Sequence, residues 1–349
     1  MRLRMRTLAT MLAAPLFAAG CGAGEKTDEE RGREVASGMQ ASIGAEIDAW
    51  HAAAQKMMDA APTPQGRGWD AKLDAEALEK MRAAWGETRA TYEHIEGAVA
   101  PLFPDIDAST DARYEAFLVE LGNEADPDPF DGKGVTGMHG IERILFSDTT
   151  PAAVVTFEEG LPGYSKAAFP ATEEEAARFK GELCGLLVND IASLQSQWGS
   201  AELDLPGAFD GLISLMNEQH EKVNKAATGE EESRYSQKTL ADLRANLVGT
   251  SKIYALFQPW ITSKEGGDHV DGEIQAGFAT LETAYDAIDG EAIPAPPETW
   301  SSANPTEEDL KTPFGKLFLT VSDAVDPERD GSVVFEMSEA ADLLGFPEL

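Results

Sequence analysis

The sequence predicts an all-α protein, and three features support this fold class. Apolar residues recur at helical spacing through most of the chain, as Leu78, Met81 and Trp85 do within residues 72–99. No stretch alternates between polar and apolar residues for long enough to predict a strand, and "GSVVF" at residues 331–335 is the only short β-like run. The segments between the periodic stretches are rich in proline, glycine and aspartate, which end helices.

The periodic stretches define the predicted helices in order along the chain. They cover residues 36–60, 72–99, 109–122, 173–198, 207–227, 233–257, 271–288 and 307–325, with irregular segments at 123–136, 147–171 and 290–306. Thr172 and Glu175 form the sequence pattern of a capping box at the start of one of these helices. Each half of the chain contains an aromatic-rich helix followed by a proline-bearing loop, around Pro101 and Pro259. The similarity predicts two helical bundles that arose by an ancient duplication, with antiparallel neighbours joined by short loops.

The first residues predict export. Arginines precede an apolar stretch at residues 8–19, and small residues stand directly before Cys21, a pattern typical of a bacterial lipoprotein signal peptide. Ordinary secretion is the alternative. The predicted organisation is a signal peptide at 1–20, a flexible tether at 21–35, an N-terminal bundle at 36–170 and a C-terminal bundle at 171–349.

The residues around the predicted cleavage site also predict a location. Cys21 would carry the lipid, and Gly22 rather than aspartate follows it, which favours the outer membrane. We therefore expect a lipid-anchored protein that faces the periplasm.

The composition argues against several kinds of function and binding site. The formal net charge is −34, which argues against binding to nucleic acid because the phosphates would be repelled, but is compatible with cations. Two cysteines provide no disulfide framework once Cys21 is lipidated, and Cys184 lies in an apolar helical run that predicts a buried thiol. Five histidines in the whole chain exclude a histidine-rich metal site.

The stretch "GMHGIE" at residues 137–142 carries the first candidate site. His139 and Glu142 are three residues apart, so on a helix both side chains lie on one face. This pairing of imidazole and carboxylate binds metal ions in helical bundles, and it suits iron, zinc or copper. A hydrogen-bonded pair on a helix surface is the alternative.

An earlier predicted helix carries an unusual polar stripe. Its members at helical spacing are Trp85, Arg89, Tyr92 and Glu96. Charged residues on a face that points to the core need partners, because buried unpaired charge is unfavourable. Glu96 could therefore meet His139 and Glu142 across the bundle, or it could form an ion pair with Arg89 or Arg113.

Four segments together resemble the imelysin-like family. They are "GMHGIE", "TYEHIEG" at 91–97, "DIDASTDARYE" at 105–115 and "SRYSQKTLADLRANLVGTSKIY" at 233–254, and the resemblance spans residues 36–325. It implies an all-α fold of two bundle-like domains with a metal-associated site at His139 and Glu142. Glu96 is then the third expected member and Asp111 the fourth, with Arg113 in the same matching segment. The family includes periplasmic iron-uptake and iron-regulated proteins and a founding member described as a metallopeptidase.

Three functions follow from these observations. The first is a lipoprotein that binds a metal ion, with iron favoured over zinc or copper, alone or as a chelate, and serves iron transporter components. The second is a metallopeptidase that uses the same side chains, although the common zinc motif would need a second histidine where Val135 or Arg143 stands. The third is a structural lipoprotein whose polar residues only form hydrogen bonds in the core.

Overall fold

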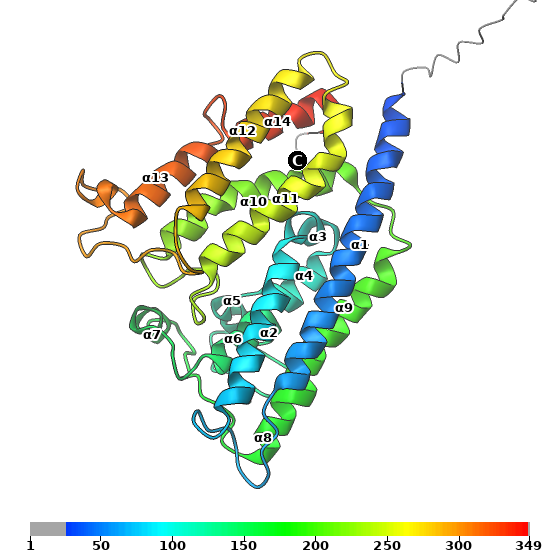
Figure 1. Ribbon diagram of the computed structural model, residues 1–349. Helices are drawn as coiled ribbons and strands as arrows, with labels where there is room; N and C mark the ends of the chain where they lie inside the picture. Colours follow the sequence, from blue (N-terminus) through cyan, green and yellow to red (C-terminus); the bar gives the residue numbers. More distant parts are fainter. Residues whose placement is uncertain (1–25, 348–349) are drawn as a thin grey trace, which may run out of the picture.

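The computed structural model describes residues 26–347, and these residues form helices joined by loops, with no strand among them (Figure 1). The predicted all-α fold is therefore confirmed. The predicted signal peptide, the lipidation site Cys21 and the first part of the tether lie outside the described residues. Within the described part, no helix is both long and apolar enough to cross a membrane.

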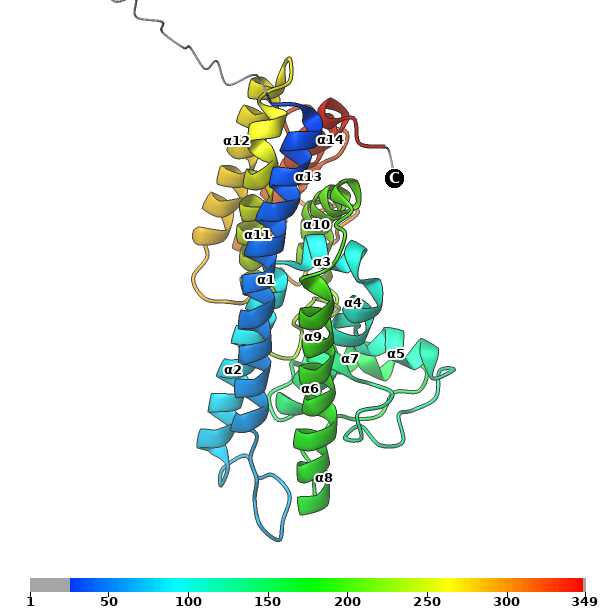
Figure 2. The same cartoon turned by 90° about the vertical axis from the view of Figure 1, so that its right-hand side faces the viewer.

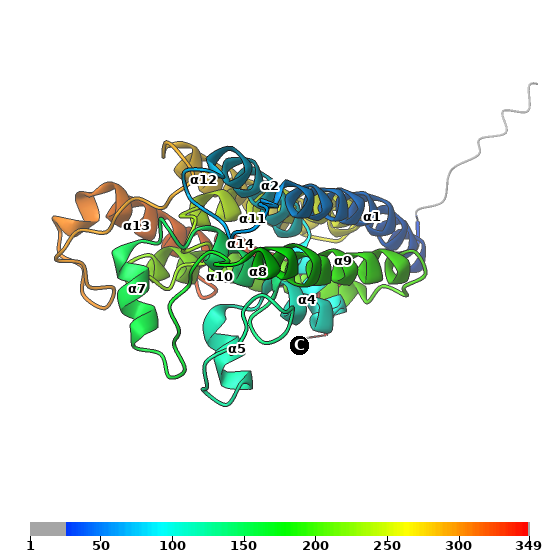
Figure 3. The ribbon, with the colours of Figure 1, turned by 90° about the horizontal axis from the view of Figure 1, so that it is seen from below.

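The first group of helices runs from the N-terminal end to α9. It comprises α1 (Asp28–Ala60), α2 (Ala75–Glu93), α3 (Glu96–Leu102), α4 (Pro104–Asp111), α5 (Tyr114–Glu120), α6 (Gly137–Leu145), α7 (Ala152–Glu159), α8 (Glu173–Arg178) and α9 (Cys184–Trp198). A π-helical turn at Phe179–Leu183 joins α8 to α9. Helix α1 packs along α2 on one side and α9 on the other, and α5 and α7 project away from these three helices (Figures 2 and 3).

The second group forms the other bundle. It comprises α10 (Leu205–Lys225), α11 (Thr239–Ile261), α12 (Gly267–Asp286), α13 (Pro313–Val325) and α14 (Val333–Leu344), with a 3-10 turn at Asp309–Lys311. The β-like run at 331–335 is helical from Val333 onward, because Ser332 caps α14 and the two valines are buried. The short run therefore forms no strand, in agreement with the all-α prediction.

The start of α1 differs from the predicted tether. Thr27 and Glu30 form a capping box, so the helix begins at Asp28 and residues 28–35 are helical. This end of α1 is held by the last turn of α11 and the turn after it, because the indole of Trp260 donates a 2.9 Å hydrogen bond to Asp28 and Lys264 forms a 2.7 Å ion pair with it. The contacts with a distant part of the chain explain why a charged segment with few apolar residues is ordered.

The predicted domain boundary at residue 170 falls before α8 and α9 and stays a prediction. Both helices come after this residue, yet α9 packs along α1, and the second bundle begins with α10. The larger of two hydrophobic clusters continues through both bundles, and the smaller one consists of Tyr114, Phe117, Leu118 and Val135. The ancient duplication stays a prediction.

The predicted helix at 72–99 is interrupted at His94 and Ile95, where α2 ends and α3 begins. Helix α11 crosses this break so closely that a Cβ on Gly249 would lie 2.1 Å from the His94 carbonyl oxygen. In the same way, a Cβ on Gly211 of α10 would lie 2.0 Å from the Gly97 carbonyl oxygen. Glycines therefore let the second bundle contact the α2–α3 junction, and the candidate site lies at this contact.

Candidate metal centre

Helix α6 begins against the end of α4 because of a glycine. Gly137 has a φ of +69°, and a Cβ there would lie 2.6 Å from the Thr110 carbonyl oxygen. The indole of Trp85 donates a 3.0 Å hydrogen bond to the Met138 carbonyl oxygen and holds the first turn of α6 against α2. The first glycine of the "GMHGIE" motif thus allows the approach that brings His139 to Asp111, the last residue of α4.

The imidazole of His139 faces two carboxylates through one ring nitrogen. Nε2 lies 3.4 Å from Oδ1 of Asp111 and 3.6 Å from Oε1 of Glu232, and it has no hydrogen-bond partner among the described residues. One ligand atom from each of these three residues lies within 4.8 Å of the others. The side chain of His139 is 2% exposed. A buried nitrogen without a partner between two carboxylate oxygens is the arrangement that a metal ion would complete.

Glu142 contacts the other ring nitrogen of His139. Its Oε2 lies 3.0 Å from Nδ1, while its Oε1 accepts a 2.8 Å hydrogen bond from the backbone N–H of Ser236. Glu142 therefore lies beside His139, as predicted from the helical spacing, but on the side away from Asp111 and Glu232.

Glu96, the third expected ligand, has different partners. Its carboxylate accepts a 2.8 Å hydrogen bond from Asn246 of α11 and lies 3.6 Å from Nζ of Lys222 on α10. Asn246 also donates to Glu93 and accepts from Lys222 at 3.4 Å. Glu96 thus belongs to the contact between the bundles, next to the group of three but outside it.

The supporting residues of the polar stripe surround this group. Arg89 forms ion pairs with Asp111 and Glu93, and it lies 3.3 Å from Glu232. The hydroxyl of Tyr92 donates to Asp107. Arg113 lies at the edge, where its guanidinium donates a 3.4 Å hydrogen bond to the Glu230 carbonyl oxygen in the loop that carries Glu232.

Negative charge exceeds positive charge in this buried region. We call the residues joined by ion pairs to Arg89 or Lys222 the acidic cluster; its carboxylates are Glu93, Glu96, Asp111, Glu232 and Asp242. Five carboxylates against two permanent cations leave an excess of three negative charges, before His139 is considered. Because uncompensated charge is unfavourable in the interior, protons or an added cation must balance the excess.

The pKa shifts show where protons are held. Burial raises the pKa of Asp111 to about 7 and that of Asp242 to about 6, although Arg89 acts in the opposite direction on both. Burial and Arg89 lower the pKa of His139, but the neighbouring carboxylates of Glu142, Glu232 and Asp111 outweigh them and raise it to about 9. Burial also opposes ionisation of Glu232, yet Lys222 and His139 hold its pKa well below its usual range. A metal ion would thus meet an ionised Glu232 and displace protons from the other two residues.

The sequence reasoning missed Glu232. It lies in the loop between α10 and α11 and is 6% exposed, as is its neighbour Glu231. One sequence feature could have identified Glu232: two adjacent glutamates directly precede the "SRYS" segment that carried part of the resemblance.

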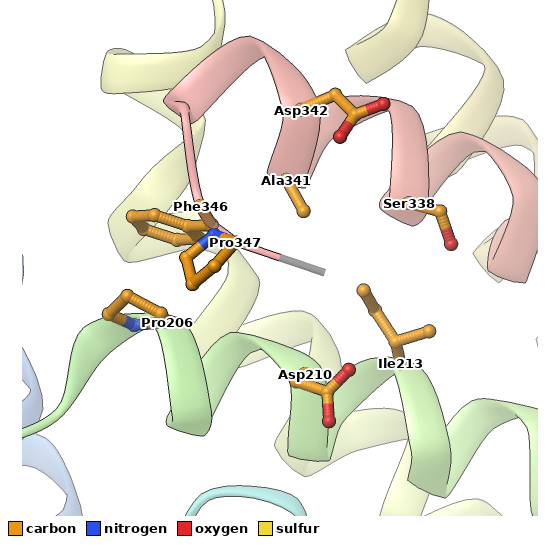
Figure 4. A pocket seen from close by; sticks show the side chains of 8 residues that line it. All are labelled: Pro206, Asp210, Ile213, Ser338, Ala341, Asp342, Phe346 and Pro347. Atoms are coloured by element: carbon orange, nitrogen blue, oxygen red, sulfur yellow. The ribbon is translucent and has the colours of Figure 1, made fainter. Parts of the chain in front are cut away.

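A pocket that is distinct from the acidic cluster in its lining residues lies between α10 and α14 (Figure 4). This pocket has a volume of about 240 Å³ and is lined by Pro206, Asp210, Ile213, Ser338, Ala341, Asp342, Phe346 and Pro347. It shares none of its lining residues with the acidic cluster, so the candidate site rests on the buried side chains alone.

Comparison with known proteins places these observations in context. The family described as Imelysin matches residues 37–316. The iron uptake system component EfeO of Escherichia coli K12 is 29% identical over 216 residues, which are 60% of this chain and 45% of that protein, and EfeO of Shigella flexneri matches equally. The chain thus spans less than half the length of these relatives. A crystal structure described as an iron-regulated protein A precursor from Parabacteroides distasonis shares the fold, with a TM-score of 0.51 and 15% identity over 92% of this chain and 97% of that one.

Proposed function

This chain belongs to the imelysin family, and from that premise we propose that it binds a metal ion, specifically iron, as cargo for uptake or handling. Asp111, His139 and Glu232 provide the ligand atoms. His139 contributes Nε2, and the two carboxylates contribute oxygens that offset the charge of the ion. Imidazole and carboxylate ligands suit iron, and zinc or copper would also fit this donor set.

The observation that carries the proposal is the unpartnered Nε2 of His139 between two carboxylates. His220 also has a buried Nε2 without a hydrogen-bond partner, but its ring packs on Phe318, whereas Nε2 of His139 faces two carboxylate oxygens. The excess of buried carboxylates points in the same direction, because a cation removes the electrostatic cost that the metal-free protein meets with protons.

The similarity to iron uptake components supports iron as the cargo. We propose that the protein is exported and that a lipid on Cys21 anchors it in the outer membrane, facing the periplasm. Components of an iron transporter would receive the ion or its chelate there.

Metal binding to the purified protein tests the proposal. The protein should bind about one iron ion per chain at the proposed site, measured by anaerobic titration with ferrous iron and elemental analysis of the loaded protein. His139→Ala should lower the affinity by more than about 100-fold, which is the upper range for partners outside the ligand set. His269→Ala is the matched control, because His269 is exposed and outside the cluster. Equal affinity of the two variants would exclude His139 as a ligand and overturn the proposal.

The metallopeptidase hypothesis makes a different prediction. Here a metal-bound water would attack a peptide bond, with one of the neighbouring carboxylates as general base. Cleavage of a peptide library that requires metal and is lost in His139→Ala would favour this function. The group of three ligands contains a single histidine, which differs from the common zinc-peptidase set.

A further inference from the structure

We propose that Glu142 is a positioning residue that holds two of the metal ligands, His139 and Glu232, in place without binding the ion itself. This inference rests on the proposed function, because it assigns a role within the same site. It separates the two polar residues of the "GMHGIE" motif into a ligand and its support.

Both carboxylate oxygens of Glu142 are occupied by other groups. Oε2 lies 3.0 Å from Nδ1 of His139, and Oε1 accepts the 2.8 Å hydrogen bond from the Ser236 backbone N–H. The residue is 0% exposed, and among the described residues no lysine or arginine lies within ion-pair distance of it. Its charge is therefore directed to His139, and both oxygens point away from the nitrogen that would meet the ion.

The contact with Nδ1 determines which nitrogen of His139 can bind metal. A carboxylate can only accept a hydrogen bond, so Nδ1 must carry a proton when it faces Glu142. The neutral imidazole then has its lone pair on Nε2, between Asp111 and Glu232. Carboxylates in this position are common partners of metal-bound histidines, where they fix the tautomer and the ring orientation.

The contact with Ser236 fixes the loop that carries Glu232. The loop has its own hydrogen bonds, from the Ser233 backbone N–H to Thr239 at 3.1 Å and from the Ser233 hydroxyl to Asp242. These bonds link the loop to α11 of the second bundle, whereas Glu142 links it to α6 of the first. Glu142 thereby sets the position of Glu232 relative to His139, which is needed because the two ligands come from different bundles.

The substitution Glu142→Gln separates positioning from ligation. The amide oxygen of the glutamine can still accept from Ser236, which leaves its NH₂ group facing Nδ1. This group donates to Nδ1 and favours the tautomer with the proton on Nε2, where it blocks the metal. We expect the affinity for ferrous iron to fall about 10- to 100-fold, the usual effect of losing such a partner.

Two variants calibrate this effect. Glu232→Gln removes a proposed ligand and should lower the affinity by more than about 100-fold. Glu336→Gln is the matched control, because Glu336 is also buried and accepts a backbone hydrogen bond, from Gly331 at 3.0 Å, but lies on α14. It should bind iron as the unchanged protein does.

Two spectroscopic measurements exclude a merely structural effect. The first is nitrogen NMR of the metal-free proteins at a pH where the imidazole is neutral. The His139 ring proton should be on Nδ1 in the unchanged protein and on Nε2 in Glu142→Gln. X-ray absorption of the iron-loaded proteins should give the same number of protein ligands with Glu142 or glutamine at this position.

Each outcome decides between the two proposals. Loss of one oxygen ligand in Glu142→Gln, an affinity as low as that of Glu232→Gln, or an unchanged tautomer would overturn the positioning role. If the unchanged protein bound no iron, the proposed function itself would fail.

Discussion

Helix α6 contributes to two buried charged regions, which differ in whether their positive and negative charges balance. Four residues after His139, Arg143 forms a 3.0 Å ion pair with Glu158, and Tyr235 donates a hydrogen bond to the same carboxylate. The guanidinium carbon of Arg143 lies 3.8 Å from the centre of the Tyr114 ring. In this Arg143 cluster one cation pairs with one anion. Both carboxylate oxygens of Glu158 accept hydrogen bonds.

The acidic cluster around His139 lacks this balance. Its carboxylates outnumber Arg89 and Lys222, and Nε2 of His139 has no partner among the described residues. Both regions are buried, and the loop between α10 and α11 supplies a residue to each, Tyr235 and Glu232. The difference indicates that the Arg143 cluster stabilises the fold, whereas the acidic cluster needs protons or an added cation to balance its charge.

Breaking the balanced cluster should have the largest effect on stability. Arg143→Met leaves Glu158 buried without its cation, and we expect the free energy of unfolding to fall by about 3–5 kcal/mol. Urea unfolding at neutral pH without metal measures this loss. Arg329→Met is the control, because the pair of Arg329 with Asp323 is exposed to solvent and should contribute little to stability. Similar losses in the two variants would contradict the structural role of the Arg143 cluster.

A smaller loss should follow from changing the glycine that joins α4 to α6. Gly137→Ala places a side chain at a φ of +69° and against the Thr110 carbonyl oxygen, so stability should fall by roughly 1–3 kcal/mol from backbone strain and further from the contact. His139 should also shift relative to Asp111, which weakens iron binding.

Gly290→Ala is the control that separates backbone strain from the steric contact of the added Cβ. Gly290 has a φ of +91° and no heavy atom within 4 Å of the added Cβ, so only strain applies. Thermal unfolding and iron titration of both variants should show weaker iron binding in Gly137→Ala alone. Weaker binding in neither variant would mean that the α4–α6 contact does not position the site.

The last expected effect is a change of slope rather than a loss at one pH, and it concerns the pH dependence of the unbalanced cluster. The pKa of Asp111 is raised by burial to about 7, above its value of about 3.9 in an unfolded chain. The folded protein therefore holds this proton more tightly, and its stability falls as the pH rises from about 4 to about 7. Asp111→Asn removes this contribution.

Unfolding curves of the metal-free proteins across this range provide the measurement. The stability of Asp111→Asn should fall less steeply with pH, by at most one proton or about 1.4 kcal/mol per pH unit. Parallel pH profiles of the two proteins would show that Asp111 is ionised throughout and that the charge excess is balanced elsewhere.

The sequence could predict part of the site because that part depends on local spacing. His139 and Glu142 are neighbours on one helix, and their contact follows from the three-residue interval. The polar stripe was also informative, since Trp85 and Arg89 both contact the site. The prediction for Glu96 depended on one continuous helix, and the break at His94 and Ile95 changed its direction, so that it pairs with Lys222.

Other residues of the site could not be placed by spacing. Glu232 lies in a loop with no helical periodicity and reaches His139 from 93 positions away in the chain. Its position depends on hydrogen bonds from the loop to α6 and α11. The helical start of α1 was missed for the same reason, because its partners Trp260 and Lys264 are distant in sequence.

By itself, the sequence determined the all-α class and the pairing of His139 with Glu142, since both follow from the periodicity of a helix. The tertiary structure decided which carboxylates face the free nitrogen of His139 and where the bundles meet. Those features depend on close approach at glycines such as Gly137 and Gly249, and on the balance of buried charges. Helical spacing is a property of neighbouring residues, whereas burial and charge balance are set by chain segments that meet only in the folded protein.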